Sequence, residues 1–150
     1  MLNANLSSVS GKIDTSGTNL TIDSPSVFTA LGIKNIAIGY NALDNATGDA
    51  DNNVAIGYEA MTDQATGGNN VVIGYQAGFD MNGHQYNTAV GSYAMGLCNG
   101  GENSNTAIGY SAMKSVTGAS QYNVSIGSTS LTGGIGAVND CIAIGYTAMD

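Results

Sequence analysis

The chain has 150 residues with 22 glycines, one proline and no tryptophan, and its three lysines, eleven acids and lack of arginine give a formal net charge of −8. This acidic composition argues against nucleic-acid binding, which needs basic patches to meet phosphates, and against an anionic membrane surface. The length suits one ordinary domain, and no apolar stretch is long enough for a transmembrane helix.

Residues 1–34 differ from the rest of the chain. Alternating residues predict short strands at 11–14 and 19–23, Pro25 interrupts the pattern, and an apolar run follows over residues 26–32. An open solenoid end has unpaired backbone groups, so we interpret residues 1–34 as a docking or capping segment. The start at Met1 carries neither the basic region nor the apolar run of a signal peptide, so we expect no export signal.

Residues 35–150 form an array in which one motif recurs, shown in full by Asn105-Thr-Ala-Ile-Gly-Tyr-Ser-Ala-Met113. The motif glycines are Gly39, Gly57, Gly74, Gly91, Gly109, Gly127 and Gly145, spaced by 18, 17, 17, 18, 18 and 18 residues. This period is too short for a βαβ unit of about 30 residues. It predicts an all-β fold, a parallel β-solenoid of about seven coils of 17–18 residues.

Within the motif, residues alternate with the two-residue period of a β-strand. The residue before the glycine is the least variable large one, so we predict that it forms the core. This core row is Ile38, Ile56, Ile73, Val90, Ile108, Ile126 and Ile144. The preceding position is small, which would let a neighbouring chain approach closely. That row is Ala37, Ala55, Val72, Ala89, Ala107, Ser125 and Ala143.

Three further columns follow from stacking equivalent residues. The asparagines that open the motif predict a side-chain amide ladder: Asn35, Asn53, Asn70, Asn87, Asn105 and Asn123. The methionines Met61, Met95, Met113 and Met149 are expected to fill core gaps. The tyrosines are either candidate glycan contacts or a structural ladder: Tyr40, Tyr58, Tyr75, Tyr110 and Tyr146. Ser92 and Ser128 replace two of them, and Tyr93 would place its ring on the other face.

The segments between motifs are polar and contain glycine, which is typical of turns. We expect short insertions after Gly67 or Gly118 to be tolerated. His84 has Asp80 and Ser92 nearby in sequence, but a lone histidine in a turn is more often structural than catalytic.

Another turn holds acidic and amide side chains that could bind Ca²⁺ weakly: Asp44, Asp49, Asp51 and Asn53. Val54 stands where a calcium loop of the EF-hand type needs glycine, so an ordinary solvated turn is favoured. Cys98 and Cys141 are not equivalent in register and predict free thiols. The sequence therefore predicts no catalytic, cofactor or metal site.

The Asn-x-Ala-Ile-Gly motif, as in Asn53-Val-Ala-Ile-Gly57, resembles the head repeat of YadA-like trimeric autotransporter adhesins, in the form found in phage tail fibres and other virion appendages. The resemblance covers residues 35–149 and implies a left-handed β-roll with three chains around one axis. The small-residue row from Ala37 to Ala143 would then face the trimer axis, where three apolar strips become buried together. The turns here are longer than in adhesin heads, whose repeat is nearer 14 or 15 residues.

These features favour a structural virion protein over an enzyme: a homotrimeric phage fibre, spike or capsid decoration that docks to other virion proteins through residues 1–34. Host attachment through surface glycans is a further expectation. The alternative is the head of a bacterial surface adhesin, which would require an export signal, a stalk and a membrane anchor. Ice binding would need a regular threonine array, whereas the threonines here are scattered. The chain ends one residue after the seventh motif, so either another chain caps the last coil or the protein continues.

Overall fold

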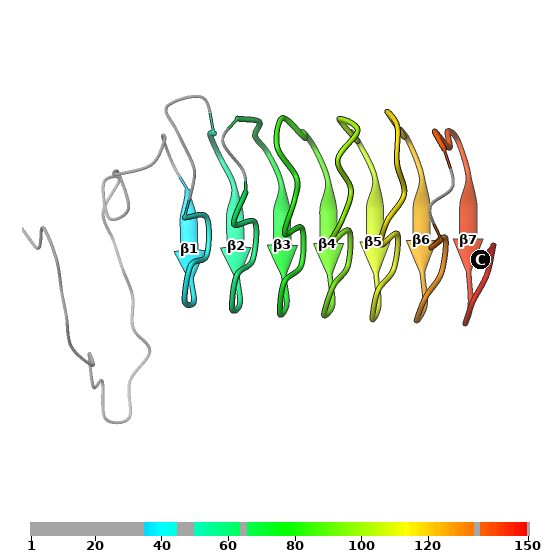
Figure 1. Cartoon of the computed structure of the whole chain (residues 1–150), viewed down its shortest axis with the longest axis horizontal. Coiled ribbons are helices and arrows are strands. Elements are labelled where there is room, and N and C mark those ends of the chain that lie inside the picture. The colour runs from blue at the N-terminus through cyan, green and yellow to red at the C-terminus, as the bar shows by residue number, and fades with distance from the viewer. Residues whose placement is uncertain (1–34, 45–49, 64–65, 134–135, 150) are drawn as a thin grey trace, which may run out of the picture.

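The computed structural model describes residues 35–44, 50–63, 66–133 and 136–149. Within these ranges lie seven three-residue strands: β1 (Ile36–Ile38), β2 (Val54–Ile56), β3 (Val71–Ile73), β4 (Thr88–Val90), β5 (Thr106–Ile108), β6 (Val124–Ile126) and β7 (Ile142–Ile144). They form one parallel sheet in chain order, side by side in Figure 1. The predicted all-β parallel solenoid is confirmed, and the predicted docking segment 1–34 lies outside the described residues.

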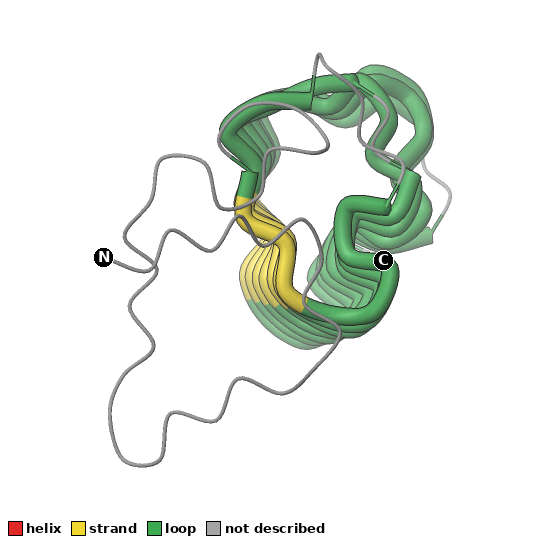
Figure 2. Tube along the Cα trace, turned by 90° about the vertical axis from the view of Figure 1, so that its left-hand side faces the viewer, coloured by secondary structure: helices red, strands yellow, loops and turns green. Residues whose placement is uncertain are grey.

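Neighbouring coils stack residue on equivalent residue. Ala37 pairs with Ala55 and Ile38 with Ile56, and the same register continues through β6 and β7. Seen along the solenoid, the coils superpose, with the strands on one side and the turns on the others (Figure 2). Each motif position therefore forms a column along the whole array.

The two faces of the strands are the reverse of the prediction. The predicted core row is partly or largely exposed, with Ile108 at 39% and Ile38 at 55%. The row predicted to face the trimer instead lines the interior of its own coil. Ala55, Val72, Ala89, Ala107 and Ser125 are 0% exposed and Ala143 is 2% exposed, while Ala37 in the first coil is partly buried.

The outward row comprises Ile38, Ile56, Ile73, Val90, Ile108, Ile126 and Ile144, and Ile56 and Val90 are its half-buried members. A two-residue period separates two faces of a strand without saying which one is inside. The interior is narrow, because a second small-residue row lies in it beside the strand row: Ala42, Ala60, Ala77, Ala94, Ala112 and Ser130. Small side chains fill this space, and the one β-branched member of the strand row, Val72, packs beside Gly78, which has no side chain.

One large side chain per coil completes the core. Leu43, Met61, Met95, Met113 and Leu131 are 0–1% exposed, which confirms three of the four predicted core methionines. Met149, in the last coil, is 53% exposed.

The third repeat fills this core position differently. Gly78 stands where the other repeats have leucine or methionine, and Met81 enters from the turn with 0% exposure. A Cβ on Gly78 would collide with the Met81 sulfur atom, so the two side chains compete for one space. A residue of the turn thus replaces a missing residue of the motif.

The motif glycines let successive coils approach closely. Gly109 has φ +137°, and a Cβ there would collide with the carbonyl group of Gly127 in the next coil. Any other residue would be strained at this φ and would push the coils apart.

The predicted asparagine ladder is present and buried. Asn105 Nδ2 donates to Asn87 Oδ1 at 3.2 Å and to the Ser120 carbonyl at 2.9 Å. Amide-to-amide bonds of this kind join every neighbouring pair from Asn53 to Asn123. At the start of the array, Asn35 Oδ1 accepts the backbone N–H of Asn53 at 2.8 Å. The ladder ties each strand to the turn that follows it, and each buried hydrogen bond contributes about 1 kcal/mol.

Candidate interaction surface

The outward strand face is a candidate interaction surface that runs along the whole described array. Two columns of mostly β-branched residues run along it. The first column is Ile36, Val54, Val71, Thr88, Thr106, Val124 and Ile142, and the second is the predicted core row described above. Val71 is 38% and Ile73 36% exposed in the middle of the array, so exposure is not confined to its ends. A contiguous apolar strip of this length marks an interaction surface in a soluble protein.

The tyrosine row runs along the edge where the strands end. Tyr40, Tyr58 and Tyr75 stack with ring centroids 5.3 Å apart and interplanar angles of 18° and 9°. They are 44–66% exposed. Stacking covers both faces of Tyr58, so this part of the row offers ring edges and hydroxyl groups to a ligand. A sugar that packs against a ring face would find such a face only at the ends of the stack.

Tyr93 rejoins this row from the next position in the motif. Its ring centroid lies 5.4 Å from Tyr75 and 6.1 Å from Tyr110, with interplanar angles of 75° and 87°. The expectation that its ring would move to another face was therefore wrong, because the side chain is long enough to reach the row. Lys114 Nζ lies 4.4 Å from the centroid of this turned ring.

Two phenols in the row have a raised pKa. The pKa of Tyr58 is raised because its hydroxyl hydrogen-bonds the Glu59 side chain and is repelled by that charge. The pKa of Tyr93 is raised mainly by removal from water and further by Tyr75, while Lys114 opposes the change. Both shifts favour neutral hydroxyl groups, which can donate hydrogen bonds.

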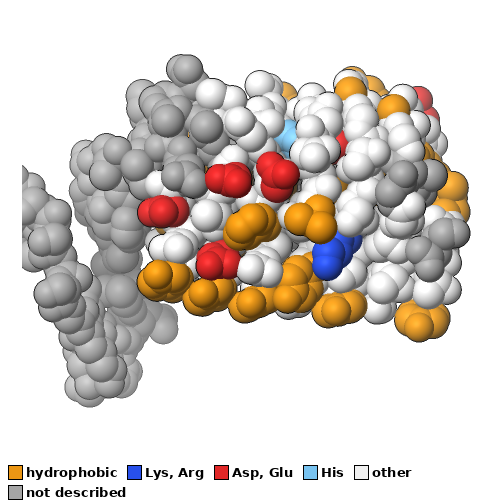
Figure 3. Space-filling view, viewed as in Figure 1, with side chains coloured by type: hydrophobic (Ala, Val, Ile, Leu, Met, Phe, Trp, Pro, Cys, Tyr) orange, Lys and Arg blue, Asp and Glu red, His pale blue; other side chains and the backbone are white. Residues whose placement is uncertain are grey.

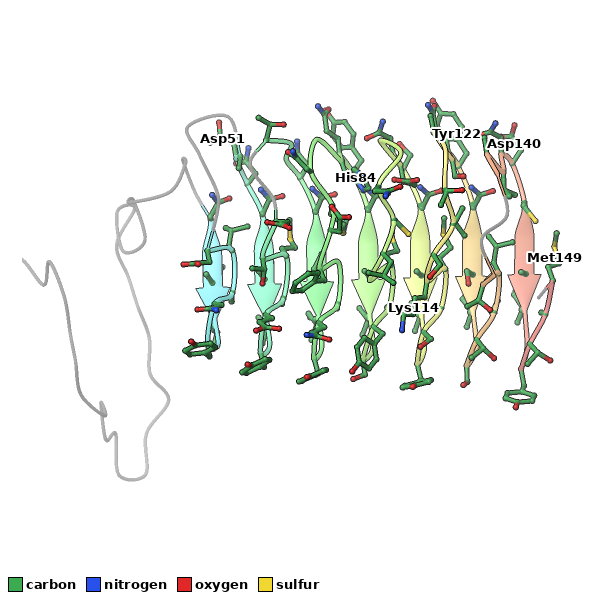
Figure 4. All side chains as sticks on the ribbon, in the orientation of Figure 1. Asp51, His84, Lys114, Tyr122, Asp140 and Met149 are labelled. Carbon is green, nitrogen blue, oxygen red and sulfur yellow. The ribbon has the colours of Figure 1, made fainter. Side chains whose placement is uncertain are left out.

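A buried histidine–glutamate contact lies among the turns. His84 Nε2 is 2.9 Å from Glu102 Oε2, and both side chains are 0% exposed. The Glu102 carboxylate also accepts the Gly100 N–H at 3.0 Å. His84 lies near the upper ends of the strands in Figure 4, well away from Lys114. The structure thus gives His84 an acid partner other than the Asp80 considered from the sequence.

The sequence analysis did not predict this pair, although the spacing of the two residues from the ladder asparagines could have indicated it. Each residue stands three positions before a ladder asparagine, Asn87 or Asn105, in adjacent repeats. Equivalent positions stack, so the offset places the imidazole beside the carboxylate. The carbonyls of His84 and Glu102 also accept the ladder amides at 2.9 and 2.8 Å.

The predicted calcium candidates do not converge. Asn53 is buried in the ladder, where its Oδ1 accepts the N–H of Asn70 at 3.0 Å. Asp44 is exposed, Asp51 is half-buried, and Asp49 lies outside the described residues. Among the residues that the structure describes, no three His, Cys, Asp or Glu side chains are grouped to hold a metal ion.

Both cysteines are free thiols, as predicted. Cys98 is buried and donates to the Met113 carbonyl at 2.9 Å. Burial raises the pKa of this thiol far above its ordinary value, and the charge of Glu102 adds to the shift. Cys141 is partly exposed in the last coil, with its sulfur 3.1 Å from that of Met149.

The described ranges contain no helix with the length and apolar character needed to cross a membrane. Comparison with known proteins gives no further assignment: no family model, no curated protein and no solved structure matches this chain.

Proposed function

We propose that this chain is a non-catalytic structural protein that assembles as a homotrimer and forms a projecting part of a phage particle. The observation that carries the proposal is the outward strand face, with its two columns of β-branched, mostly apolar residues along the described array. A regular, stackable coil whose long apolar strip faces water is suited to assembly with identical strips.

The interface follows from the corrected orientation of the strands. The alanine row is buried inside its own coil, so the two outward β-branched columns are the surface available for contact with another chain. Each fully buried isoleucine or valine side chain would contribute about 1.5–3 kcal/mol. Cyclic symmetry would cover the strip of every chain at once. The number three, and the left hand of the β-roll, come from the resemblance of the motif to YadA-like heads.

Placement in a virion rests on the same resemblance, in the form found in phage fibres, spikes and capsid decorations. In this proposal residues 1–34 dock to other virion proteins and the array projects outward, with attachment to host glycans as an added role. The head of a bacterial surface adhesin is the second candidate, and the exposed tyrosine row is the feature that favours attachment.

Sedimentation of the full chain tests the assembly. We expect the wild type to sediment as a trimer at micromolar concentration. Ile108→Glu places a charge on the outward face and should give a folded monomer. Ala107→Glu, one residue away, places the charge inside the coil and should unfold it. A folded wild-type monomer, or an Ile108→Glu trimer, would refute the proposal.

The particle itself can be tested with an antibody against the array. We expect gold-labelled antibody to mark an external appendage of purified phage particles. Labelling confined to a bacterial surface would favour the adhesin instead.

A further inference from the structure

A hollow opens on the described surface beside coils three to five. Its volume is about 240 Å³, and it is lined by Gln76, Phe79, Tyr93, Gly96, Leu97 and Lys114. Figure 3 shows the blue Lys114 next to hydrophobic side chains on the face toward the viewer. Figure 2 places the strands on the opposite side of the coil, so assembly through the strands would leave the hollow open.

Three of the lining residues occupy one column of the turns. The position after the ninth residue of the motif is Phe79, Gly96 and Lys114 in three successive repeats. Gly96 donates its N–H to the Tyr93 carbonyl at 3.0 Å, which keeps the turn tight there. Gly96 therefore separates Phe79 from Lys114 in this column, and all three residues line the hollow.

The walls combine one charge with apolar and amide groups. Lys114 is the single lysine or arginine within the described ranges. Phe79 is half-buried, and Leu97 is 48% exposed despite its size. Gln76 brings a side-chain amide, whose Nε2 donates to Glu59 Oε2 at 2.6 Å. The turned ring of Tyr93 is nearly perpendicular to its neighbours, and Lys114 Nζ lies over it, 4.4 Å from the ring centroid.

We propose that this hollow binds a carboxylated monosaccharide, such as the terminal uronic acid of an acidic glycan. Lys114 would pair with the carboxylate, since an ammonium–carboxylate hydrogen bond is stronger than a neutral one. The apolar face of the sugar ring would pack against Phe79 and Leu97, and the Gln76 amide would meet a hydroxyl group.

The size of the hollow limits the ligand. Pockets for drug-sized ligands start at about 300 Å³, so this one suits a single ring. The site is built within one chain and depends neither on the proposed trimer nor on its place in a virion. The positive charge of the hollow comes from Lys114 alone, whereas the whole chain has a formal net charge of −8.

Titration of the full chain with two matched sugars tests the proposal. Methyl β-glucuronide and methyl β-glucoside share a ring and differ in the carboxylate. By NMR we expect saturable shifts around Lys114 with the glucuronide, with a Kd on the order of 1 mM, and at least about tenfold weaker binding of the glucoside. Equal binding of both sugars, or no saturable glucuronide binding, would overturn the proposal.

Variants separate the hollow from a simple charge effect. Lys114→Met keeps the apolar stem and should weaken glucuronide binding about tenfold. Leu97→Glu places a carboxylate at the mouth and should abolish binding. Adding Thr132→Lys to Lys114→Met returns an ammonium to the same column one coil later and should not restore binding. Restoration would overturn the proposal, and so would tighter binding of N-acetyl-leucine, which would indicate a peptide carboxylate.

Discussion

Each coil has two parts: a motif half of nine residues, such as 105–113, and a turn half that runs to the next motif. Residues in the two halves stack on the neighbouring coils in different ways. In the motif half, like stacks on like: Asn87 bonds to Asn105, and Ala89 pairs with Ala107. In the turn half, unlike residues meet in adjacent coils, as His84 does with Glu102. The distance between neighbouring coils is the same in both halves, so the difference lies in which side chains can stack at that distance.

This difference explains where the charges are. Coils in a parallel stack are about 4.8 Å apart. Identical charges at that distance would repel, while amides, alanines and aromatic rings can stack on themselves. Glu59 is the one charged residue among the seven motifs, and it meets Gln76 rather than another acid. The turns, free of that constraint, hold the His84–Glu102 contact, the buried Cys98 thiol and most residues that line the hollow.

The largest expected effect comes from breaking the close approach in the motif half. Gly109→Val adds a Cβ that collides with the Gly127 carbonyl and forces a strained φ, so we expect a loss of more than about 4 kcal/mol and no cooperative melting. Gly136→Val is the control, because a Cβ on that exposed turn glycine meets nothing within 4 Å. Similar melting temperatures for both variants would contradict the assigned role of the motif glycines.

Removing one member of the buried His84–Glu102 contact should have the second-largest effect. Glu102→Ala removes the carboxylate from both His84 and the Gly100 N–H inside the protein, and losing a partner costs each buried polar group about 1–3 kcal/mol. Urea unfolding measures it, with Asp44→Ala on the surface as control. Adding His84→Ala should cost less than the sum of the two single changes, because the residues are coupled. Strict additivity would show that the pair contributes no coupling.

Much of the motif half could be predicted from the sequence, because its period alone sets coil number, register and ladder. The faces of the strands could not, since alternation is symmetric until the width of the interior is known. Ala107 and Ile108 were therefore assigned the wrong way round.

The turn half was less predictable, because its contacts join residues that the repeat does not conserve from coil to coil. Predicting the pairing of His84 with Glu102 would have required counting their shared offset from the ladder asparagines. Predicting that Met81 fills the core position of the third repeat would have required the conformation of the folded turn.

Met81 offers a test of how far the turn half can substitute for the motif half. Met81→Ala should open a cavity and cost about 2–5 kcal/mol in thermal unfolding. Met149→Ala, at a 53% exposed site, is the matched control and should cost far less. Adding Val72→Ala and Gly78→Met restores the packing of the other repeats. The equivalent Met61 has φ 52°, so Met is accommodated at that φ and most of the loss should be recovered.

The buried thiol predicts a smaller, pH-dependent effect. The folded state raises the pKa of Cys98, so an ionised thiol is favoured only after unfolding, above the ordinary value of 9.0. The stability that this group contributes is complete below that pH and is lost as the pH rises, by about 1.4 kcal/mol per unit. Urea unfolding at about pH 8 and about pH 10 should show a steeper loss in wild type than in Cys98→Ala. Equal losses would mean that the thiol is not held neutral.

The smallest effect should come from lengthening an exposed turn. Thr117, Gly118 and Ala119 are exposed, so five polar residues inserted after Gly118 change loop closure and little else. Doubling a loop costs about 0.6 kcal/mol, and a chain of this size should lose about 2 °C in melting temperature. Insertion after Gly67, expected from the sequence to be equally mild, should cost more, because Gly67 is buried and its carbonyl accepts the Asn53 amide at 3.3 Å.

The same five residues inserted after Ala107 provide the comparison, because they interrupt β5 and shift its register against both neighbours. Every column beyond that point would then lose its partner, so cooperative melting should disappear. If the insertion after Gly118 were as damaging as the one after Ala107, the turns would carry the register as strongly as the strands. The separation of the coil into a stacking half and a variable half would then be wrong.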